Sequence, residues 1–298
     1  MMRAISRHKR VLSYIFYGIL LLVALLYLRF PSGAINAYLQ AKADEISPRY
    51  HVLVEKVRPS LPFGVKFLRT KVSLRGYPDK IPFFSESLRI NPEIISFVKG
   101  KSKYKFDCFA YRGEIKGYVH FTNNRMDGPF TTSIGLQNVH LHDYGYLSTL
   151  ISRDVKGILG GTITYSGQSK LLLNGVGEAN LGIADGRVEI LEPILGLNSV
   201  DFDELRIKMF LDKQKINVAS VELEGPDLRG TLSGTISLNK DFSESTLALK
   251  GSIEPLAGLF TSDKGNTEAL QFLRRRLKRG KLSFVIRGTP AEPKIRFI

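Results

Sequence analysis

Few residues in this chain have the type and spacing for chemistry, and the clearest group is the segment Val-His-Leu-His-Asp at 139–143. Side chains two residues apart on a strand point to the same face of a sheet, so His140 and His142 could both face one metal ion. The sequence has no His-Glu-x-x-His or Cys-x-x-Cys motif and no third ligand at recognisable spacing. We therefore expect a strand with polar residues on its outer face rather than a metal site.

Two acidic pairs, Asp201/Asp203 and Glu222/Glu224, have the same alternating spacing. Paired carboxylates can perform acid–base catalysis, but alternating acids are also the ordinary pattern of a strand with one solvated face. The single cysteine, Cys108, cannot form an intramolecular disulfide and has no histidine close to it in sequence. A Walker loop and a Gly-x-Ser-x-Gly motif are both missing. The sequence therefore predicts a protein that is not an enzyme and uses neither cofactor nor metal.

The elements that position these residues are predicted to be β-strands. From about Tyr50 onward, short runs rich in β-branched and aromatic residues alternate with polar residues, and Gly, Pro, Asn and Asp separate the runs. Helical patterns are sparse, with short pieces at 93–98 and 145–152. The clearest strand patterns lie at 51–57, 65–74, 104–111, 117–122, 131–141 and 186–191.

The chain also repeats itself. The segment KGILGGTITY at 156–165 matches RGTLSGTISL at 229–238, and YRGEIKGYVHF at 111–121 is a weaker copy. Each of the first two precedes a turn region and a further predicted strand that ends in Gly, at 171–175 and 247–251. Recurring hairpins of this kind predict a mostly β fold: an elongated, curved, groove-like antiparallel sheet with few short helices.

The longest apolar run lies near the N-terminus, from Val11 to Leu28 and including Leu20 and Leu22. At about 1.5 Å per residue it is roughly 27 Å long, enough for one helical crossing of a bilayer. A cleaved signal peptide would have a shorter apolar core of about 7–15 residues. The run follows a basic cluster, which favours a cytoplasmic N-terminus: Arg3, Arg7, Lys9 and Arg10. We expect a tip and anchor over 1–30 in the bacterial inner membrane, a stalk helix over 31–49 and a periplasmic β-rich domain over 50–298.

The net charge of +15 is concentrated at the two ends of the chain. The nearly neutral middle argues against a nucleic-acid partner, which would require a basic face across the folded domain. A predicted amphipathic helix at 267–279 carries the second basic cluster: Arg274, Arg275, Arg276, Lys278 and Arg279. Two expectations remain open for this helix: it packs on the sheet edge with a solvated basic face, or it contacts anionic lipid or an acidic partner.

Three segments carry a family resemblance: LPFGVKFLRTKVSL at 61–74, the strand, Asn-Pro, short helix, Gly-Lys, strand order over 81–119, and RGKLSFVIRGTPAEPKIRF at 279–297. With the N-terminal anchor, they resemble the type II secretion system protein N (GspN) family. The layout is also similar to the AsmA-like periplasmic proteins, whose β-grooves are associated with lipid handling.

The two resemblances imply different functions. The first implies a non-enzymatic, inner-membrane-anchored subunit of a type II protein secretion system that contacts other subunits. The second implies a groove that binds or transfers phospholipid or lipopolysaccharide between the inner and outer membranes. Strands with one apolar face look the same in sequence whether they cover a packed core or a lipid. An uncovered trough of Ile, Leu, Val and Phe would favour lipid, and a filled core would favour a scaffold.

Overall fold

The computed structural model describes residues 13–18, 21, 22, 25, 27, 29–46, 50–61, 63–77, 81–122, 128–151, 153–194, 197–239, 241–256 and 280–298. Val11, Leu20 and Leu28 of the predicted anchor lie outside these residues, whereas Leu22 lies in helical backbone and is 58% exposed. The four basic residues before the anchor and the predicted helix at 267–279 with its basic cluster also lie outside them. No helix among the described residues is long and apolar enough to cross a membrane.

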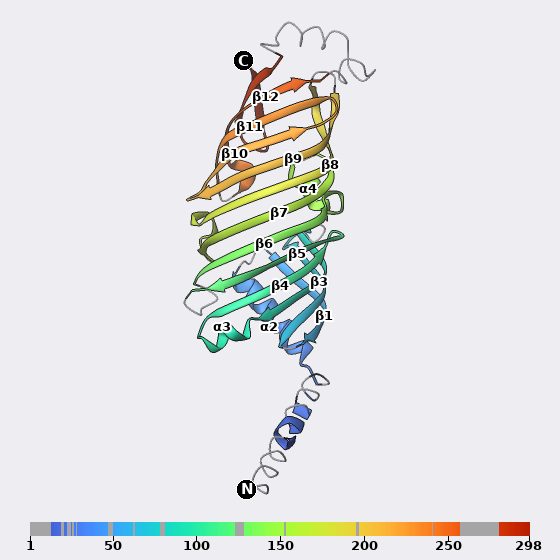
Figure 1. Cartoon of the computed structure of the whole chain (residues 1–298), viewed down its shortest axis with the longest axis vertical. Helices are drawn as coiled ribbons and strands as arrows, with labels where there is room; N and C mark the ends of the chain where they lie inside the picture. Colours follow the sequence, from blue (N-terminus) through green and yellow to red (C-terminus); the bar gives the residue numbers. More distant parts are fainter. Residues whose placement is uncertain are drawn as a thin grey trace, which may run out of the picture.

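One open antiparallel sheet dominates the structure (Figure 1). Within the described ranges it has fourteen strands, and their order in the sheet is their order in the chain. The prediction of a mostly β, antiparallel fold with few short helices is therefore confirmed. The strands are β1 Tyr50–Ser60, β2 Gly64–Leu74, β3 Phe83–Pro92, β4 Ser102–Ala110, β5 Gly113–Phe121, β6 Pro129–His140, β7 Val155–Gln168, β8 Val176–Ile194, β9 Leu197–Asp212, β10 Lys215–Glu224, β11 Leu228–Ser237, β12 Thr246–Pro255, β13 Leu282–Gly288 and β14 Pro293–Phe297.

Short helices occupy the connections and one end of the sheet. They are α2 Ser32–Ile46, α3 Ile94–Val98 and α4 Gly145–Ile151, with 3-10 turns η1 Leu141–Asp143, η2 Leu172–Asn174 and η3 Phe242–Glu244. The predicted strand at 171–175 is wrong, because this segment closes the connection between β7 and β8 as turn η2. The Leu171 and Asn174 N–H groups donate to Gln168 and Leu171 there, which leaves no extended backbone to pair in the sheet.

The sequence repeat has a structural cause at its glycines. Gly161 and Gly234 occupy matching positions in the two copies, with φ of +134° and +141°. A Cβ at either position would approach a carbonyl oxygen of the next strand, Asn180 at 2.2 Å and Ala248 at 2.3 Å. Only glycine combines this conformation with so close an approach at low cost. The repeat therefore marks two positions at which the sheet requires glycine.

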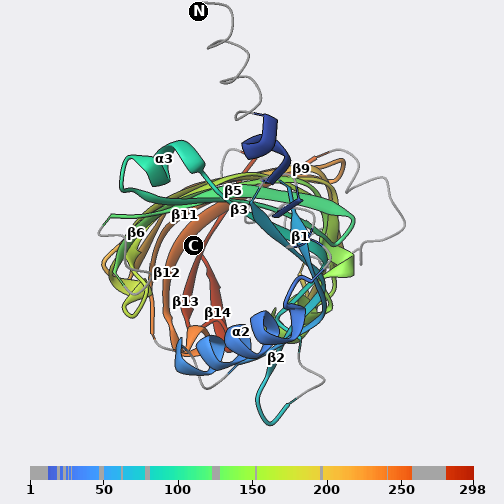
Figure 2. The ribbon, with the colours of Figure 1, turned by 90° about the horizontal axis from the view of Figure 1, so that it is seen from below.

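The sheet curls around its long axis, so that it has a concave and a convex face (Figure 2). Register shifts help it to curl, because a bulge increases the local twist; they occur between Leu136 and Val139 in β6 and between Val218 and Val221 in β10. Strands β1 and β12 lie toward opposite ends of the long axis (Figure 1). We call the β1–β3 end proximal and the β12–β14 end distal.

Candidate ligand groove

One apolar row runs the full length of the concave face. Following the registered pairs from β1 to β14 selects one residue from each strand, and none of them is charged. This central ladder is Val57, Phe67, Leu88, Cys108, Ile115, Leu136, Gly161, Leu181, Ile207, Val221, Leu232, Gly251, Phe284 and Phe297.

A second apolar row lies beside the first, two residues along each strand except β10, where the bulge between Val218 and Val221 makes the spacing three. This second ladder is Pro59, Val65, Ile90, Phe106, Gly117, Ile134, Ile163, Ala179, Met209, Val218, Gly234, Leu249, Ile286 and Ile295. Residues two apart share a face of a strand, so the two ladders form one continuous apolar strip. The strip contains no charged side chain in any of the fourteen strands.

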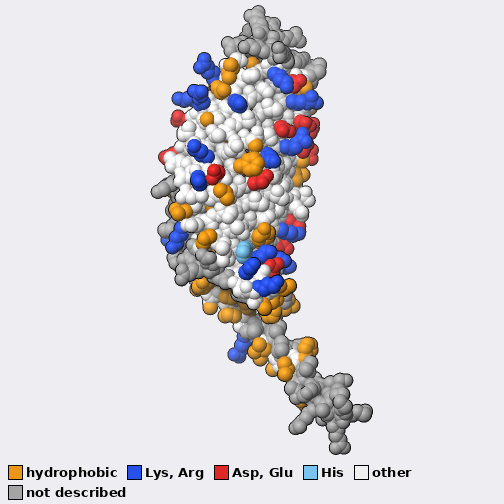
Figure 3. Space-filling model, turned by 60° about the vertical axis from the view of Figure 1, so that its left-hand side comes forward, with side chains coloured by type: hydrophobic (Ala, Val, Ile, Leu, Met, Phe, Trp, Pro, Cys, Tyr) orange, Lys and Arg blue, Asp and Glu red, His pale blue; other side chains and the backbone are white. Residues whose placement is uncertain are grey.

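The convex face has the opposite character. The row one residue away from the second ladder is polar from β2 to β9: Lys66, Arg89, Asp107, Lys116, Gly135, Thr162, Asn180 and Lys208. Figure 3 shows charged side chains of both signs spread over this side, with apolar side chains in small groups over the strands. The sheet therefore separates an apolar inner surface from a hydrated outer one.

Strand β7 shows how far the concave face is filled. From Gly161 to Gln168 its side chains alternate between half-buried inner positions and exposed outer ones. Ile163 and its registered partner Ile134 are half-buried rather than buried, as is Ile115 of the central ladder. A filled core buries such residues completely, since packed interiors leave little space around side chains. The middle of the concave face therefore has the character of a groove.

The proximal end of this groove is covered by α2. Ile35 and Leu39 of the helix pack with Phe30 against Val54, Val57 and other concave-face residues of β1–β3. The side chain of Asn36 donates to the Val54 carbonyl at 3.2 Å, and its own oxygen is buried without a hydrogen-bond partner. Residues assigned by sequence to a stalk thus pack on the sheet as α2 (Figure 2).

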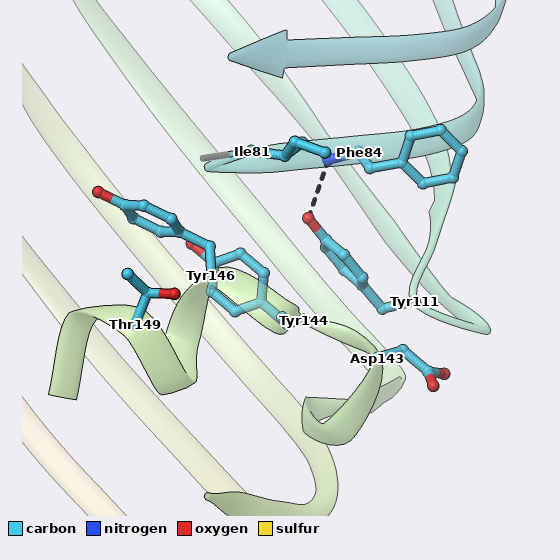
Figure 4. Close-up of a pocket in the computed structure, with 8 residues that line it drawn as sticks. Ile81, Phe84, Tyr111, Asp143, Tyr144, Tyr146 and Thr149 are labelled. Carbon is cyan, nitrogen blue, oxygen red and sulfur yellow. Dashed lines mark hydrogen bonds between the residues drawn. The ribbon is translucent and has the colours of Figure 1, made fainter. Parts of the chain in front are cut away.

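A pocket of about 390 Å³ adjoins the groove at one rim (Figure 4). Three connections supply its walls: those between β2 and β3, between β4 and β5, and between β6 and β7. We call it the rim pocket, and it is lined by Ile81, Phe84, Tyr111, Asp143, Tyr144, Gly145, Tyr146 and Thr149. The sequence did not predict this pocket, because Tyr111 lies in the turn after β4 while Tyr144 and Tyr146 lie at the start of α4, and only the fold brings them together.

The two candidate histidine ligands lie in different elements of the structure and make different contacts. Strand β6 ends at His140, and His142 lies in η1, so the expected strand does not carry both. The His140 ring is hydrogen-bonded to the Asn138 carbonyl at 3.0 Å, and His142 lies 4.0 Å from Asp154. Within the described part of the chain, His, Cys, Asp and Glu form no group of three or more that could hold a metal.

Among the acidic candidates, Asp201, Glu222 and Glu224 form ion pairs on the outer side of the sheet, whereas Asp203 is an exposed residue of β9. Glu222 and Glu224 share a face as predicted, and both lie near Arg206, with the closer contact 3.0 Å from Arg206 Nη2 to Glu224 Oε1. Asp201 forms a two-pronged ion pair with Arg187, which raises the pKa of that guanidinium. These contacts join neighbouring strands, which is a structural role.

Cys108 belongs to the central ladder and is 2% exposed. Burial raises the pKa of its thiol, which disfavours the reactive thiolate. Its position makes it a small apolar member of the groove wall.

Comparison of this chain with family models, with characterised proteins and with solved structures finds no match.

Proposed function

We propose that this protein is a non-enzymatic, membrane-anchored lipid-binding protein that holds phospholipid acyl chains in its concave groove. The observation that carries the proposal is the pair of charge-free apolar ladders, which are half-buried at Ile115, Ile134 and Ile163 in the middle of the concave face. Acyl chains have no hydrogen-bonding groups, so the surface that suits them is continuous, apolar and free of charge.

The dimensions of the groove suit this ligand. Thirteen strand intervals at about 4.8 Å give an apolar strip roughly 60 Å long. One leaflet of a bilayer has a hydrocarbon thickness of about 15 Å, half of the roughly 30 Å core. The strip is therefore several acyl chains long. Each methylene removed from water contributes about 0.8 kcal/mol, so ten methylenes contribute about 8 kcal/mol before the cost of ordering the chain.

The proposed anchor places the groove at a membrane surface. We propose that residues 11–28 span the inner membrane, with the N-terminus in the cytoplasm and the β-body in the periplasm. The apolar length and the preceding basic cluster support this assignment. Because α2 begins at Ser32 and packs on β1, such an anchor would hold the proximal end of the groove next to the bilayer. A groove in this place could carry lipid away from the inner membrane.

Membership of a type II secretion apparatus stays a prediction from the family resemblance. It requires contacts with other secretion subunits, which crosslinking in intact cells would detect. The half-buried middle of the concave face, at Ile115, Ile134 and Ile163, favours the lipid function over a scaffold with a filled core.

The test compares two charge substitutions at adjacent positions of one strand. Ile163→Glu places a carboxylate in the second ladder, whereas Thr164→Glu places one on the exposed outer side of the same strand. A charge among hydrocarbon costs about 2.5–3.5 kcal/mol, which corresponds to roughly a 100-fold loss of affinity.

The measurement is the phospholipid that remains bound to the full chain after purification from membranes in mild detergent, quantified by native mass spectrometry. We expect stoichiometric phospholipid on the unsubstituted protein and on Thr164→Glu, and strong loss on Ile163→Glu. The proposal fails if the unsubstituted protein carries no lipid, or if the two variants retain equal amounts.

A further inference from the structure

Four of the eight residues that line the rim pocket are aromatic. Tyr144 lies 5.1 Å from Tyr111 and 6.4 Å from Tyr146, measured between ring centroids. The Tyr111 hydroxyl accepts a hydrogen bond from the Phe84 N–H at 2.9 Å, which fixes that ring in place (Figure 4). Desolvation raises the pKa of Tyr111 and of Tyr144, so both hydroxyls are neutral at physiological pH. Neutral tyrosine rings have electron-rich faces that attract cations.

The protein places none of its own described cations on these faces. The cation–aromatic contacts among the described residues pair Lys103 with Tyr118 at 4.7 Å and Lys208 with Phe210 at 5.5 Å. Both lie on the outer side of the sheet, away from the pocket. The tyrosine rings therefore border a pocket of about 390 Å³ in which no described cation of the protein lies against them.

An ion pair stands at the edge of the same pocket. The Asp143 carboxylate accepts from Arg112 Nε at 2.5 Å and from Nη2 at 3.3 Å. The Arg112 side chain is 62% exposed, so the guanidinium retains donors for an anion. One negative and one positive group beside neutral aromatic faces are complementary to a zwitterion, whereas a purely anionic ligand would use only part of the site.

The pocket also joins the groove. Phe83, which lies on the concave face opposite Val72, contacts the Tyr111 ring edge-on at 6.4 Å. On the other side, Leu147 of α4 packs against the concave-face cluster of Ile183 and Phe202. A molecule in the pocket could therefore extend an apolar tail into the groove.

We propose that the rim pocket binds the zwitterionic headgroup of a phospholipid, with its ammonium group against Tyr144 and Tyr146 and its phosphate beside Arg112. This inference rests on the proposed lipid function and assigns it a headgroup class. It predicts that zwitterionic lipids bind in preference to anionic ones.

The test offers the full chain in detergent an equimolar mixture of phosphatidylcholine, phosphatidylethanolamine and phosphatidylglycerol. Bound lipids are then quantified by mass spectrometry after detergent washing. We expect the two zwitterionic lipids to be enriched about fivefold over phosphatidylglycerol, in line with one or two cation–aromatic contacts. The double variant Tyr144→Leu/Tyr146→Leu should lose the enrichment, because leucine keeps apolar volume but has no aromatic face.

Two matched variants separate recognition from folding. Tyr146→Phe retains the ring and should keep the enrichment, whereas Tyr118→Leu removes an outer-face tyrosine and should also keep it. Glycerophosphocholine, which carries the headgroup without acyl chains, should displace less than about a tenth of the bound lipid at equal concentration. Full displacement would overturn the assignment to a lipid.

The failure of this inference is distinguishable from failure of the proposed function. Equal binding of all three lipids, or an unchanged ratio in the double leucine variant, overturns the headgroup site while total bound lipid stays stoichiometric. If the unsubstituted protein binds none of the three, the lipid function fails together with the inference.

Discussion

Replacing Gly161 with alanine should destabilise the protein far more than replacing Gly182, although the two glycines lie on paired strands. Gly161 has φ of +134°, and a Cβ there would lie 2.2 Å from the Asn180 carbonyl oxygen. Gly182 has no heavy atom within 4 Å of the position of its Cβ. Comparing the two substitutions therefore isolates the requirement for glycine at position 161.

The magnitude follows from two terms. A non-glycine residue held in so sparsely populated a conformation costs about 1–3 kcal/mol. Moving the backbone away from the Asn180 carbonyl weakens a sheet hydrogen bond worth about 1 kcal/mol. We expect Gly161→Ala to cost about 2–4 kcal/mol in total. Gly182→Ala should be neutral or stabilising by up to about 1 kcal/mol, because alanine restricts the unfolded chain.

The assay is thermal unfolding of the full chain in detergent, followed by far-ultraviolet circular dichroism. A chain of this size shifts its Tm by about 2–4 °C per kcal/mol, so Gly161→Ala should melt roughly 10 °C below Gly182→Ala. Gly234→Ala should match Gly161→Ala, since its Cβ would lie 2.3 Å from the Ala248 carbonyl oxygen. A difference below about 1 °C between Gly161→Ala and Gly182→Ala would refute the reasoning.

Three further predictions concern single side chains. Hydrogen bonds from Ser96 and two lysines lower the pKa of Glu93 to about 2. Its ionised form therefore stabilises the fold above about pH 4.5, and this contribution is lost as the pH falls toward 2. Glu93→Gln should reduce the dependence of the melting temperature on pH over that range. Cys108 is buried and its thiol pKa is raised. It should therefore react with a maleimide at pH 7 far more slowly in the native protein than in urea. Rapid labelling of the native protein would contradict its place in the groove wall. Arg206 forms exposed ion pairs. Arg206→Met should therefore change the unfolding free energy by less than about 1 kcal/mol. A larger loss, measured by urea titration, would contradict the expectation that solvent-exposed ion pairs contribute little.

Several local features could be predicted from the sequence because neighbouring residues decide them. The alternation in 104–111 and 117–122 predicted strands, which the structure has as β4 and β5, and the repeated segments predicted recurring antiparallel hairpins. The same local reasoning failed at 171–175, where three leucines resemble a strand but close a turn. It also extended the strand pattern past His140, where the chain turns into η1. In both places the chain turns toward its next paired strand, so a turn forms where the residue pattern predicts a strand.

The groove itself required the register of every strand pair. A shift of one residue in a single pair would move an outer polar residue such as Thr162 or Thr164 into the apolar rows. Register depends on bulges, as between Lys156 and Ile158, and on turn lengths, which composition does not reveal. The rim pocket is a similar case, since Tyr111 and Tyr144 are far apart in the chain and meet only where two connections lie side by side.

The sequence by itself determined a β-rich, repetitive chain with a long apolar run near its start, because alternation and apolar length are local properties. The tertiary structure alone decided that the apolar positions of fourteen strands align into two uncharged ladders, and that α2 covers their proximal end. The physical reason is that one sheet face can be buried by a core, a helix or a ligand with the same residue pattern. Only the placement of the neighbouring elements shows which part of that face remains to be covered.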